Sequence, residues 1–328
     1  MSKPKVFITR SIPQQALERL LPYVDVDIWQ DQLPPSKELL SKNAHTSDAL
    51  LCMLADPLDA IFFDAPGSTL RVVSQFSVGV DNIDLDAATR HGIPVGHTPG
   101  VLTETTADFT FGLMLAAARR IVEGNNEVRQ GVWRPWGPDV LTGYDVYGAT
   151  LGLIGFGRIG QAVARRASGF SMKILYFDKF RYSNLEQELG VTYASLDQIL
   201  KQSDFISLHV YLSPETYHMI SNIEFEKMKP NAILINTARG GVVDHQALTV
   251  ALQTKKIAGA AVDVTEPEPI PGNSPLLDLP NMIIAPHIAS ASKATRLRMG
   301  HIAMDNLLAG LEDLRLPFCA NPSVYNER

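Results

Sequence analysis

The sequence predicts an α/β fold of two lobes, each built on a parallel sheet covered by helices. Its 328 residues exceed what one hydrophobic core usually organises. Short β-branched runs alternate with helical periodicity along the chain, which is typical of parallel sheets covered by helices. A composition of 45% hydrophobic and 20% charged residues is that of a globular protein and unlike that of a disordered or membrane-spanning one.

The first lobe is predicted to be a flavodoxin-like sheet that ends near Pro99. Its strands are expected at residues 6–9, 24–29, 49–54 and 70–76, where apolar and β-branched residues cluster. A helix is expected to open at Ser11-Ile12-Pro13 and to run to Leu21, because a cap-type serine and an early proline mark helix starts.

The second lobe is predicted to follow a long connecting helix. Helical periodicity over 103–130 predicts one helix, and the Trp-, Pro- and Gly-rich segment 132–148 predicts an irregular connection. Strands and helices then resume from 150 to 286. The last helix, 292–311, needs a lobe on which to pack, and we expect it to return to the first. This predicts one domain of 1–99 plus 290–328, a second of 100–289, and a cleft between them.

Charge and cysteine content narrow the classes of function. The net charge is −6, from 29 basic and 35 acidic residues, and no basic block suggests a nucleic-acid partner. Only Cys52 and Cys319 are present, so neither a disulfide nor a cysteine metal site is expected, and we predict no metal. No twenty-residue uncharged span and no signal-type N-terminus appear, which predicts a cytoplasmic protein without a membrane partner.

A glycine motif follows the first strand of the second lobe. The segment 151–160 is a buried strand that runs into G-x-G-x-x-G, formed by Gly155, Gly157 and Gly160 around Arg158 and Ile159. In dinucleotide-binding folds these glycines allow a tight turn, let backbone amides approach a pyrophosphate, and let helix and strand pack closely. The alternative for the motif by itself is an ordinary glycine-rich turn.

An acidic residue supports the dinucleotide interpretation. Asp178 ends the next strand, eighteen residues beyond Gly160, where a carboxylate would accept hydrogen bonds from the adenosine ribose. That carboxylate would repel the extra phosphate of NADP, so NAD (NADH) is favoured. Lys179 and Arg181 lie just beyond and could neutralise the phosphate, which leaves NADP as the alternative.

Three later strands end in side chains suited to oxo-acid chemistry. Arg239 follows the strand 233–236, and a guanidinium can grip a carboxylate with two parallel hydrogen bonds. For Arg239 taken alone, the alternative is a surface residue in a salt bridge. His287 follows the strand 283–284, and histidine exchanges protons near neutral pH. Three acids follow the strand between them. The other seven histidines, among them His218 and His245, lack a strand-end setting and are interpreted as surface or packing residues.

Together these residues resemble the family of D-isomer-specific 2-hydroxyacid dehydrogenases over nearly the whole chain. Within that family the sequence is most similar to glyoxylate/hydroxypyruvate reductases. The segments that carry this likeness are Asp-Val-Thr-Glu-Pro-Glu-Pro at 263–269, Pro-His-Ile-Ala-Ser at 286–290 and Asp-Asn-Leu-Leu-Ala-Gly-Leu at 305–311.

The resemblance implies a role for each site residue. Arg239 would bind the substrate carboxylate and carbonyl, and Glu268 would support His287 as the proton donor, with Glu266 as the competing carboxylate. The loop 77–81, with Val78 and Gly79, would receive the substrate carboxylate on its backbone amides. Leu54 would be a further substrate-binding residue. The cofactor site would further include Thr106, Val210, Thr216, Thr237, Ala238 and Asp263.

The resemblance predicts NADH-dependent reduction of glyoxylate or hydroxypyruvate to the D-2-hydroxy acid by a homodimer. One alternative is a dehydrogenase for a bulkier 2-oxo acid. Phosphite is disfavoured, because phosphite dehydrogenases of this family carry a lysine where this chain has Val78. A NAD-sensing binding protein similar to a transcriptional corepressor is the alternative from another class, and it would be expected to carry disordered tails.

Overall fold

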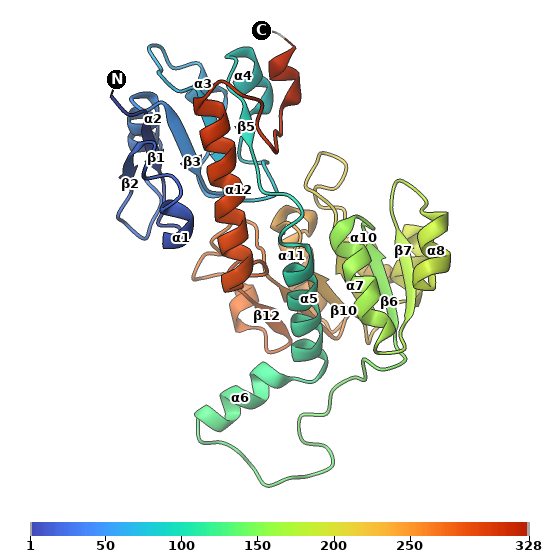
Figure 1. Cartoon of the computed structure of the whole chain (residues 1–328). Helices are drawn as coiled ribbons and strands as arrows, with labels where there is room; N and C mark the ends of the chain where they lie inside the picture. The colour runs from blue at the N-terminus through green and yellow to red at the C-terminus, as the bar shows by residue number, and fades with distance from the viewer. Residues whose placement is uncertain (1, 327–328) are drawn as a thin grey trace. The chain divides into compact units, whose positions relative to one another are not determined.

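A computed structural model describes residues 2–326. Its contacts divide the chain into two compact units. Unit 1 combines the chain up to Leu102 with the segment from Ala291 onward, and unit 2 comprises Thr103–Ser290. Each unit is built on one parallel sheet, so the predicted pair of α/β lobes is confirmed (Figure 1).

Unit 1 holds a five-stranded sheet in the order β2-β1-β3-β4-β5, the strand order of flavodoxin-like folds. Its central strands are buried along their whole length, because both faces of the sheet are covered. The strands are β1 (Lys5–Ile8), β2 (Asp25–Ile28), β3 (Ala49–Cys52), β4 (Val72–Gln75) and β5 (Val95–Gly96). The helices are α1 (Gln14–Leu17), α2 (Lys37–His45), α3 (Ala60–Phe63), α4 (Leu85–Arg90) and α12 (Lys293–Leu311), followed by the short 3-10 helix η3 (Pro322–Tyr325).

The C-terminal helix α12 completes the core of unit 1. Ser292 caps its first turn by accepting a hydrogen bond from the amide of Thr295. Its buried face contacts β3 and β4. The contact with β4 is close enough to require glycine, since a Cβ atom on Gly310 would lie 2.4 Å from Cγ2 of Val72. The last helix therefore packs on the first-lobe sheet.

Unit 2 holds a seven-stranded sheet in the order β12-β11-β10-β9-β6-β7-β8, in which every pair is parallel. Apolar clusters cover its two faces. The strands are β6 (Thr150–Ile154), β7 (Lys173–Phe177), β8 (Val191–Tyr193), β9 (Phe205–Leu208), β10 (Ile233–Asn236), β11 (Gly259–Val262) and β12 (Met282–Ile284). The helices are α5 (Thr103–Ala118), α6 (Ile121–Arg129), α7 (Arg158–Ser168), α8 (Ser183–Leu189), α9 (Leu196–Gln202), α10 (Asn222–Lys227) and α11 (His245–Gln253), with 3-10 turns η1 (Gly240–Val242) and η2 (Pro275–Asp278).

The single helix predicted for 103–130 is wrong, because the structure has two helices there. Helix α5 ends at Ala118, and Arg120 adopts a left-handed backbone with φ of 52° before α6 begins. The carbonyl oxygen of Ala118 accepts a hydrogen bond from the amide of Tyr144 at 2.8 Å. A Cβ atom on Gly143 would lie 2.1 Å from that oxygen, so the returning chain ends the helix there.

The first predicted helix is also shorter than expected. It comprises only Gln14–Leu17, with Pro13 at its N-cap position, and Ser11 lies outside it. The predicted strands agree with the observed ones to within one or two residues at each end. Both cysteines are free thiols. Among residues 2–326, no helix combines the length and apolar character needed to cross a membrane.

Candidate active site

The carboxyl ends of the unit 2 strands carry most of the predicted site residues. At the first of these ends, β6 leads through Gly155 into α7. Gly155 has a φ of +93°, and a Cβ atom there would lie 2.6 Å from the carbonyl group of His209. A Cβ atom on Gly160 would lie 2.4 Å from the carbonyl oxygen of Gly155. Both glycines are therefore required by the packing of the turn itself.

Gly157 differs from the other two glycines. It is the N-cap residue of α7, and a Cβ atom on it would meet nothing within 4 Å. The space in front of the helix N-terminus is thus open, and the backbone there presents N–H groups and the positive end of the helix dipole. Arg158 and Ile159 form the first turn of the helix. The turn therefore fits the pyrophosphate of a dinucleotide.

Asp178 faces this glycine turn from the end of β7. Its Oδ2 accepts a hydrogen bond from the amide of Phe156 at 2.7 Å, and its Oδ1 accepts one from the amide of Phe180 at 3.2 Å. The nearby Arg181 is engaged by both carboxylate oxygens of Glu186, each at 2.9 Å. A carboxylate therefore stands beside the turn, and one of the two neighbouring cations is already paired.

The remaining predicted cofactor residues lie on α5 and in the loops that follow β9, β10 and β11. The Thr110 hydroxyl bonds the carbonyl oxygen of Thr106 at 2.8 Å and lies 3.0 Å from the Thr237 hydroxyl. This contact fixes the end of β10 against α5. The hydroxyl of Thr216 accepts a hydrogen bond from the amide of Ser213 and donates one to the carbonyl oxygen of Tyr211, which shapes the loop after β9. Val210 and Ala238 are partly exposed in these same loops.

The turn that carries Arg239 is held by Asn236, a fully buried residue that sequence analysis missed. Its amide nitrogen donates to the carbonyl oxygen of Arg239 at 2.9 Å, and its Oδ1 accepts from the amide of Ala238 at 3.0 Å. The Arg239 guanidinium donates back to the carbonyl oxygen of Ala238 at 2.8 Å. An amide side chain at the end of an otherwise apolar strand is the sequence signal that could have revealed this role.

Asp263 shapes the loop that carries His287. His287 has a left-handed backbone, with φ of 54°, which costs a non-glycine residue roughly 1–3 kcal/mol. Its amide donates to the carbonyl oxygen of Asp263 at 2.8 Å. The two carboxylate oxygens of Asp263 accept hydrogen bonds from the amides of Ile288 and Ala289, at 2.8 and 2.7 Å. Three such bonds, at about 1 kcal/mol or more each, offset the backbone strain.

The acidic loop after β11 supplies one carboxylate to each of two histidines. Nδ1 of His287 lies 2.5 Å from Oε1 of Glu268, whereas Nε2 of His218 lies 2.6 Å from Oε2 of Glu266. Burial acts to raise the pKa of Glu268. The hydrogen bond and charge of His287, the amide of Thr265 and the charge of Arg239 outweigh that effect and hold the pKa below its ordinary value. Arg239, Glu268 and His287 are therefore electrostatically coupled.

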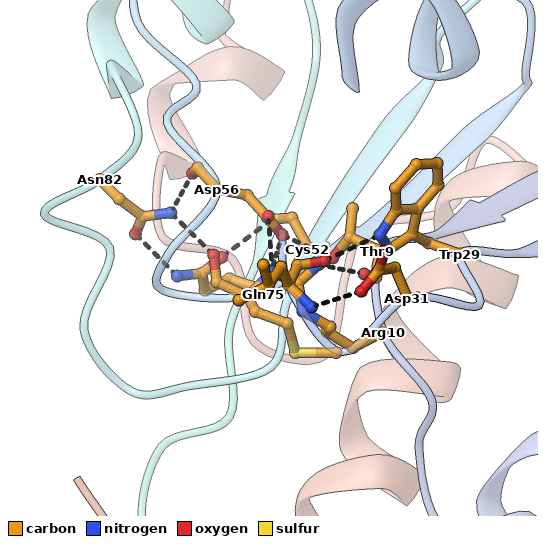
Figure 2. A network of polar contacts seen from close by, with 10 residues as sticks. Thr9, Arg10, Trp29, Asp31, Cys52, Asp56, Gln75 and Asn82 are labelled. Atoms are coloured by element: carbon orange, nitrogen blue, oxygen red, sulfur yellow. Dashed lines mark hydrogen bonds and ion pairs between the residues drawn. The ribbon is translucent and has the colours of Figure 1, made fainter. Parts of the chain in front are cut away.

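The predicted substrate loops lie at the ends of β3 and β4 in unit 1. Val78 is partly exposed, and Leu54 and Gly79 are half-buried. A network of buried and half-buried polar side chains joins these loops (Figure 2). Asn82 donates to the carbonyl oxygens of Met53 at 3.1 Å and Asp56 at 2.7 Å, and it accepts from Gln75 at 2.7 Å.

Asp56 anchors the loop that follows β3. Its Oδ2 accepts hydrogen bonds from the Thr9 hydroxyl at 2.5 Å and from the Met53 amide at 2.7 Å. Burial raises the pKa of Asp56, against the opposing effects of these donors and of the Arg10 charge. Sequence analysis did not identify this network, because its members are single polar residues scattered among apolar strand ends.

Comparisons with known proteins agree with this geometry. Residues 111–289 match the model of the D-isomer specific 2-hydroxyacid dehydrogenase family, NAD binding domain. The glyoxylate reductase of Korarchaeum cryptofilum is 53% identical over 327 residues, which cover 99% of this chain and 98% of that protein. The chain belongs to the D-isomer-specific 2-hydroxyacid dehydrogenase family. It is thus an oxidoreductase with a nicotinamide dinucleotide-binding domain, as the sequence predicts.

Two solved structures of similar proteins extend the comparison. A Thermus thermophilus protein superposes with a TM-score of 0.91 at 44% identity, covering 96% of this chain and 99% of that one. The NADPH-dependent glyoxylate/hydroxypyruvate reductase of Sinorhizobium meliloti, in complex with NADP and malonate, has a TM-score of 0.85 at 32% identity, with 97% of each chain covered. The fold of this 2-hydroxyacid dehydrogenase is therefore shared along nearly its whole length.

The glycine turn of this dehydrogenase generates a first test, which separates packing from ligand binding. Gly155→Ala should lower the free energy of unfolding by about 2 kcal/mol or more, because of its positive φ and the contact with His209. Gly157→Ala should change it by no more than about 1 kcal/mol but weaken dinucleotide binding about tenfold, since its methyl group enters the open space. Denaturant unfolding and fluorescence titration with NADH measure the two effects. Equal dinucleotide affinity of Gly157→Ala and the unmodified protein would contradict the assignment.

Proposed function

We propose that this protein uses NADH to reduce glyoxylate or hydroxypyruvate to the corresponding D-2-hydroxy acid. The observation that carries the proposal is the convergence of three groups at one sheet edge. The His287–Glu268 distance is 2.5 Å, and the charge of Arg239 contributes to the lowered pKa of Glu268. The names of the relatives, glyoxylate reductase and glyoxylate/hydroxypyruvate reductase, support this substrate class.

Each of the three side chains has a distinct task in this mechanism. The Arg239 guanidinium binds the carboxylate of the oxo acid and polarises its carbonyl. Bound NADH supplies the hydride. His287, as the imidazolium, gives its Nε2 proton to the oxygen that becomes the hydroxyl group. Glu268 accepts a hydrogen bond from the Nδ1–H group, which fixes the ring orientation and leaves Nε2 directed to the substrate.

Unit 2 is proposed as the dinucleotide-binding domain and unit 1 as the substrate-binding domain. Asp178, at the glycine turn, favours NADH, because its charge would repel the extra phosphate of NADPH. The ion pair of Arg181 with Glu186 supports this preference, since that guanidinium is already engaged. Leu54, Val78 and Gly79 are proposed to contact the substrate, with the backbone amides of the Val78–Gly79 loop receiving its carboxylate.

A kinetic panel tests the substrate and cofactor together. Glyoxylate, hydroxypyruvate, pyruvate and phenylpyruvate are each offered with NADH and with NADPH, and loss of reduced-cofactor absorbance is followed. We expect kcat/KM to be highest for glyoxylate or hydroxypyruvate, and KM to be lower for NADH than for NADPH. A preference for phenylpyruvate would favour a dehydrogenase of bulkier acids instead, and a lower KM for NADPH would reverse the cofactor assignment.

The proton-donating pair is tested by substitution. His287→Ala should lower kcat by about 100-fold or more while NADH affinity stays within about twofold, because proton donation is lost and the glycine turn is untouched. Glu268→Gln removes the negative charge next to the ring and disfavours the imidazolium, so the alkaline limb of the reduction rate should move to lower pH. The measurements are pH-dependent steady-state kinetics and NADH fluorescence titration. Unchanged kcat in His287→Ala would refute the role.

A homodimer is proposed from the surface of α6 and the chain that follows it. Helix α6 has no buried residue, and the segment from α6 to β6 stands away from the unit 2 sheet (Figure 1). Its exposed side chains include Trp133, at 75% exposure, and Trp136, at 89%. Such apolar exposure is unusual for a surface that stays in water. A second copy of this chain, which carries the same segment, would bury it on both sides of a two-fold interface.

Sedimentation velocity tests the dimer. The unmodified protein should sediment as a dimer, and a Trp133→Ser, Trp136→Ser variant should shift towards the monomer at micromolar concentration, because it loses two aromatic contacts. Tyr23→Ser, which removes an exposed aromatic residue of unit 1, serves as the matched control and should stay dimeric. A monomeric unmodified protein would contradict the proposal.

A further inference from the structure

The second His–carboxylate pair, His218–Glu266, has no task in the mechanism above. We propose that this pair is a positioning device that holds the acidic loop, and with it Glu268, in place against the turn that carries Arg239. The inference rests on the proposed function, since Glu268 is there the partner of the proton donor. In this proposal His218 acts through Glu266 and Glu268 and does not contact the substrate.

The acidic loop needs such a device because its backbone supplies few hydrogen-bond donors. Pro267 and Pro269 flank Glu268 and have no N–H group. Within the loop itself, the amide of Thr265 lies 3.4 Å from Glu268 Oε2, and the Thr265 hydroxyl bonds the carbonyl oxygen of Pro267 at 2.8 Å. Side chains from outside the loop must therefore hold it in position.

His218 connects the acidic loop to the Arg239 turn. Its backbone amide donates to the carbonyl oxygen of Gly241 at 2.8 Å, while its ring contacts Glu266 at 2.6 Å. The two segments already touch, since a Cβ atom on Gly240 would lie 2.0 Å from the carbonyl oxygen of Thr265. Movement of His218 would therefore alter the position of Glu268 relative to Arg239.

The surroundings of His218 restrict its ring to this position. His218 has a left-handed backbone with φ of 50°, and its ring stacks on Tyr217 with centroids 4.0 Å apart and planes at 15°. Seven non-glycine residues among those described have such a backbone, and His287 is another of them. Observed strain of this kind is often retained where a side chain must point in one direction.

A second histidine supports Glu266 from its backbone. The amide of Glu266 donates to Nδ1 of His245 at 3.3 Å. Burial lowers the pKa of His245, against the opposing charge of Glu266, which favours the neutral ring that can accept this bond. His245 follows Asp244, which caps α11 and also accepts the Ser221 hydroxyl at 3.0 Å. The groups around the pair are thus Tyr217, His245 and Asp244.

The test compares three variants of the pair. His218→Leu removes the ring contact with Glu266, and His218→Gln keeps an amide donor for it. Glu266→Gln keeps the size of the side chain and removes its charge. We expect His218→Leu to lower kcat by about tenfold to a hundredfold and to move the alkaline limb of the reduction rate to lower pH, as in Glu268→Gln. NADH affinity should not change.

Two further comparisons separate a positioning role of His218 from a general effect on the stability of the protein. His218→Gln should recover most of kcat, and Glu266→Gln should shift the pH profile in the same direction as His218→Leu. His91→Leu removes an exposed His–Asp pair in unit 1, where His91 lies 2.8 Å from Asp64, and should leave kcat and the pH profile unchanged. A lower melting temperature in His218→Leu with an unchanged pH profile and kcat would overturn the proposal.

Hydrogen exchange supplies a readout that is independent of the reaction. In His218→Leu the amides of Val264, Thr265, Glu266, Gly241 and Val242 should exchange faster than in the unmodified protein, while those of the glycine turn should not. If the unmodified protein reduces no 2-oxo acid, the proposed function fails, yet faster exchange at these amides would still support the positioning of the loop. Unchanged exchange at these amides would refute it.

Discussion

The parallel direction of all seven strands in the unit 2 sheet is the constraint on which the site depends. The ladder of backbone hydrogen bonds places the carboxyl ends of β6, β10, β11 and β12 on one edge. The glycine turn, Arg239, Glu268 and His287 follow these four ends, so residues far apart in the sequence emerge on the same side of the sheet. The strands are mostly apolar and can be buried on both faces, while the loops that follow them carry the polar groups of the site.

Buried polar side chains then give each loop its shape. Asp263 and Asn236 are almost fully buried, and their oxygen and nitrogen atoms are bonded to the backbones of the His287 and Arg239 loops. These contacts satisfy amide and carbonyl groups of the loops that would otherwise be costly to bury. In unit 1, Asp56 and Asn82 do the same for the two substrate loops (Figure 2).

Charge pairing distinguishes the two carboxylates of the acidic loop. Glu266 and Glu268 are separated by one proline, yet each faces a different imidazole. One of these imidazoles belongs to the proposed catalytic group and the other to the loop after β9. The same short segment is therefore connected to the loops after β9 and β12, and a change at one of these loops can reach the other through Glu266 and Glu268.

The sequence by itself determined the two-lobe α/β class, the buried strands, the glycine turn with Asp178, and the strand-end setting of Arg239 and His287. These features depend on residues close together in the chain, so periodicity and spacing are enough to indicate them. The break after Ala118, the polar supports Asp56 and Asn82 of the substrate loops, and the pairing of Glu266 with His218 were decided only by tertiary structure. Each of these depends on a partner distant in sequence or on a neighbouring loop, whose position follows from the packing of whole elements and leaves no local pattern.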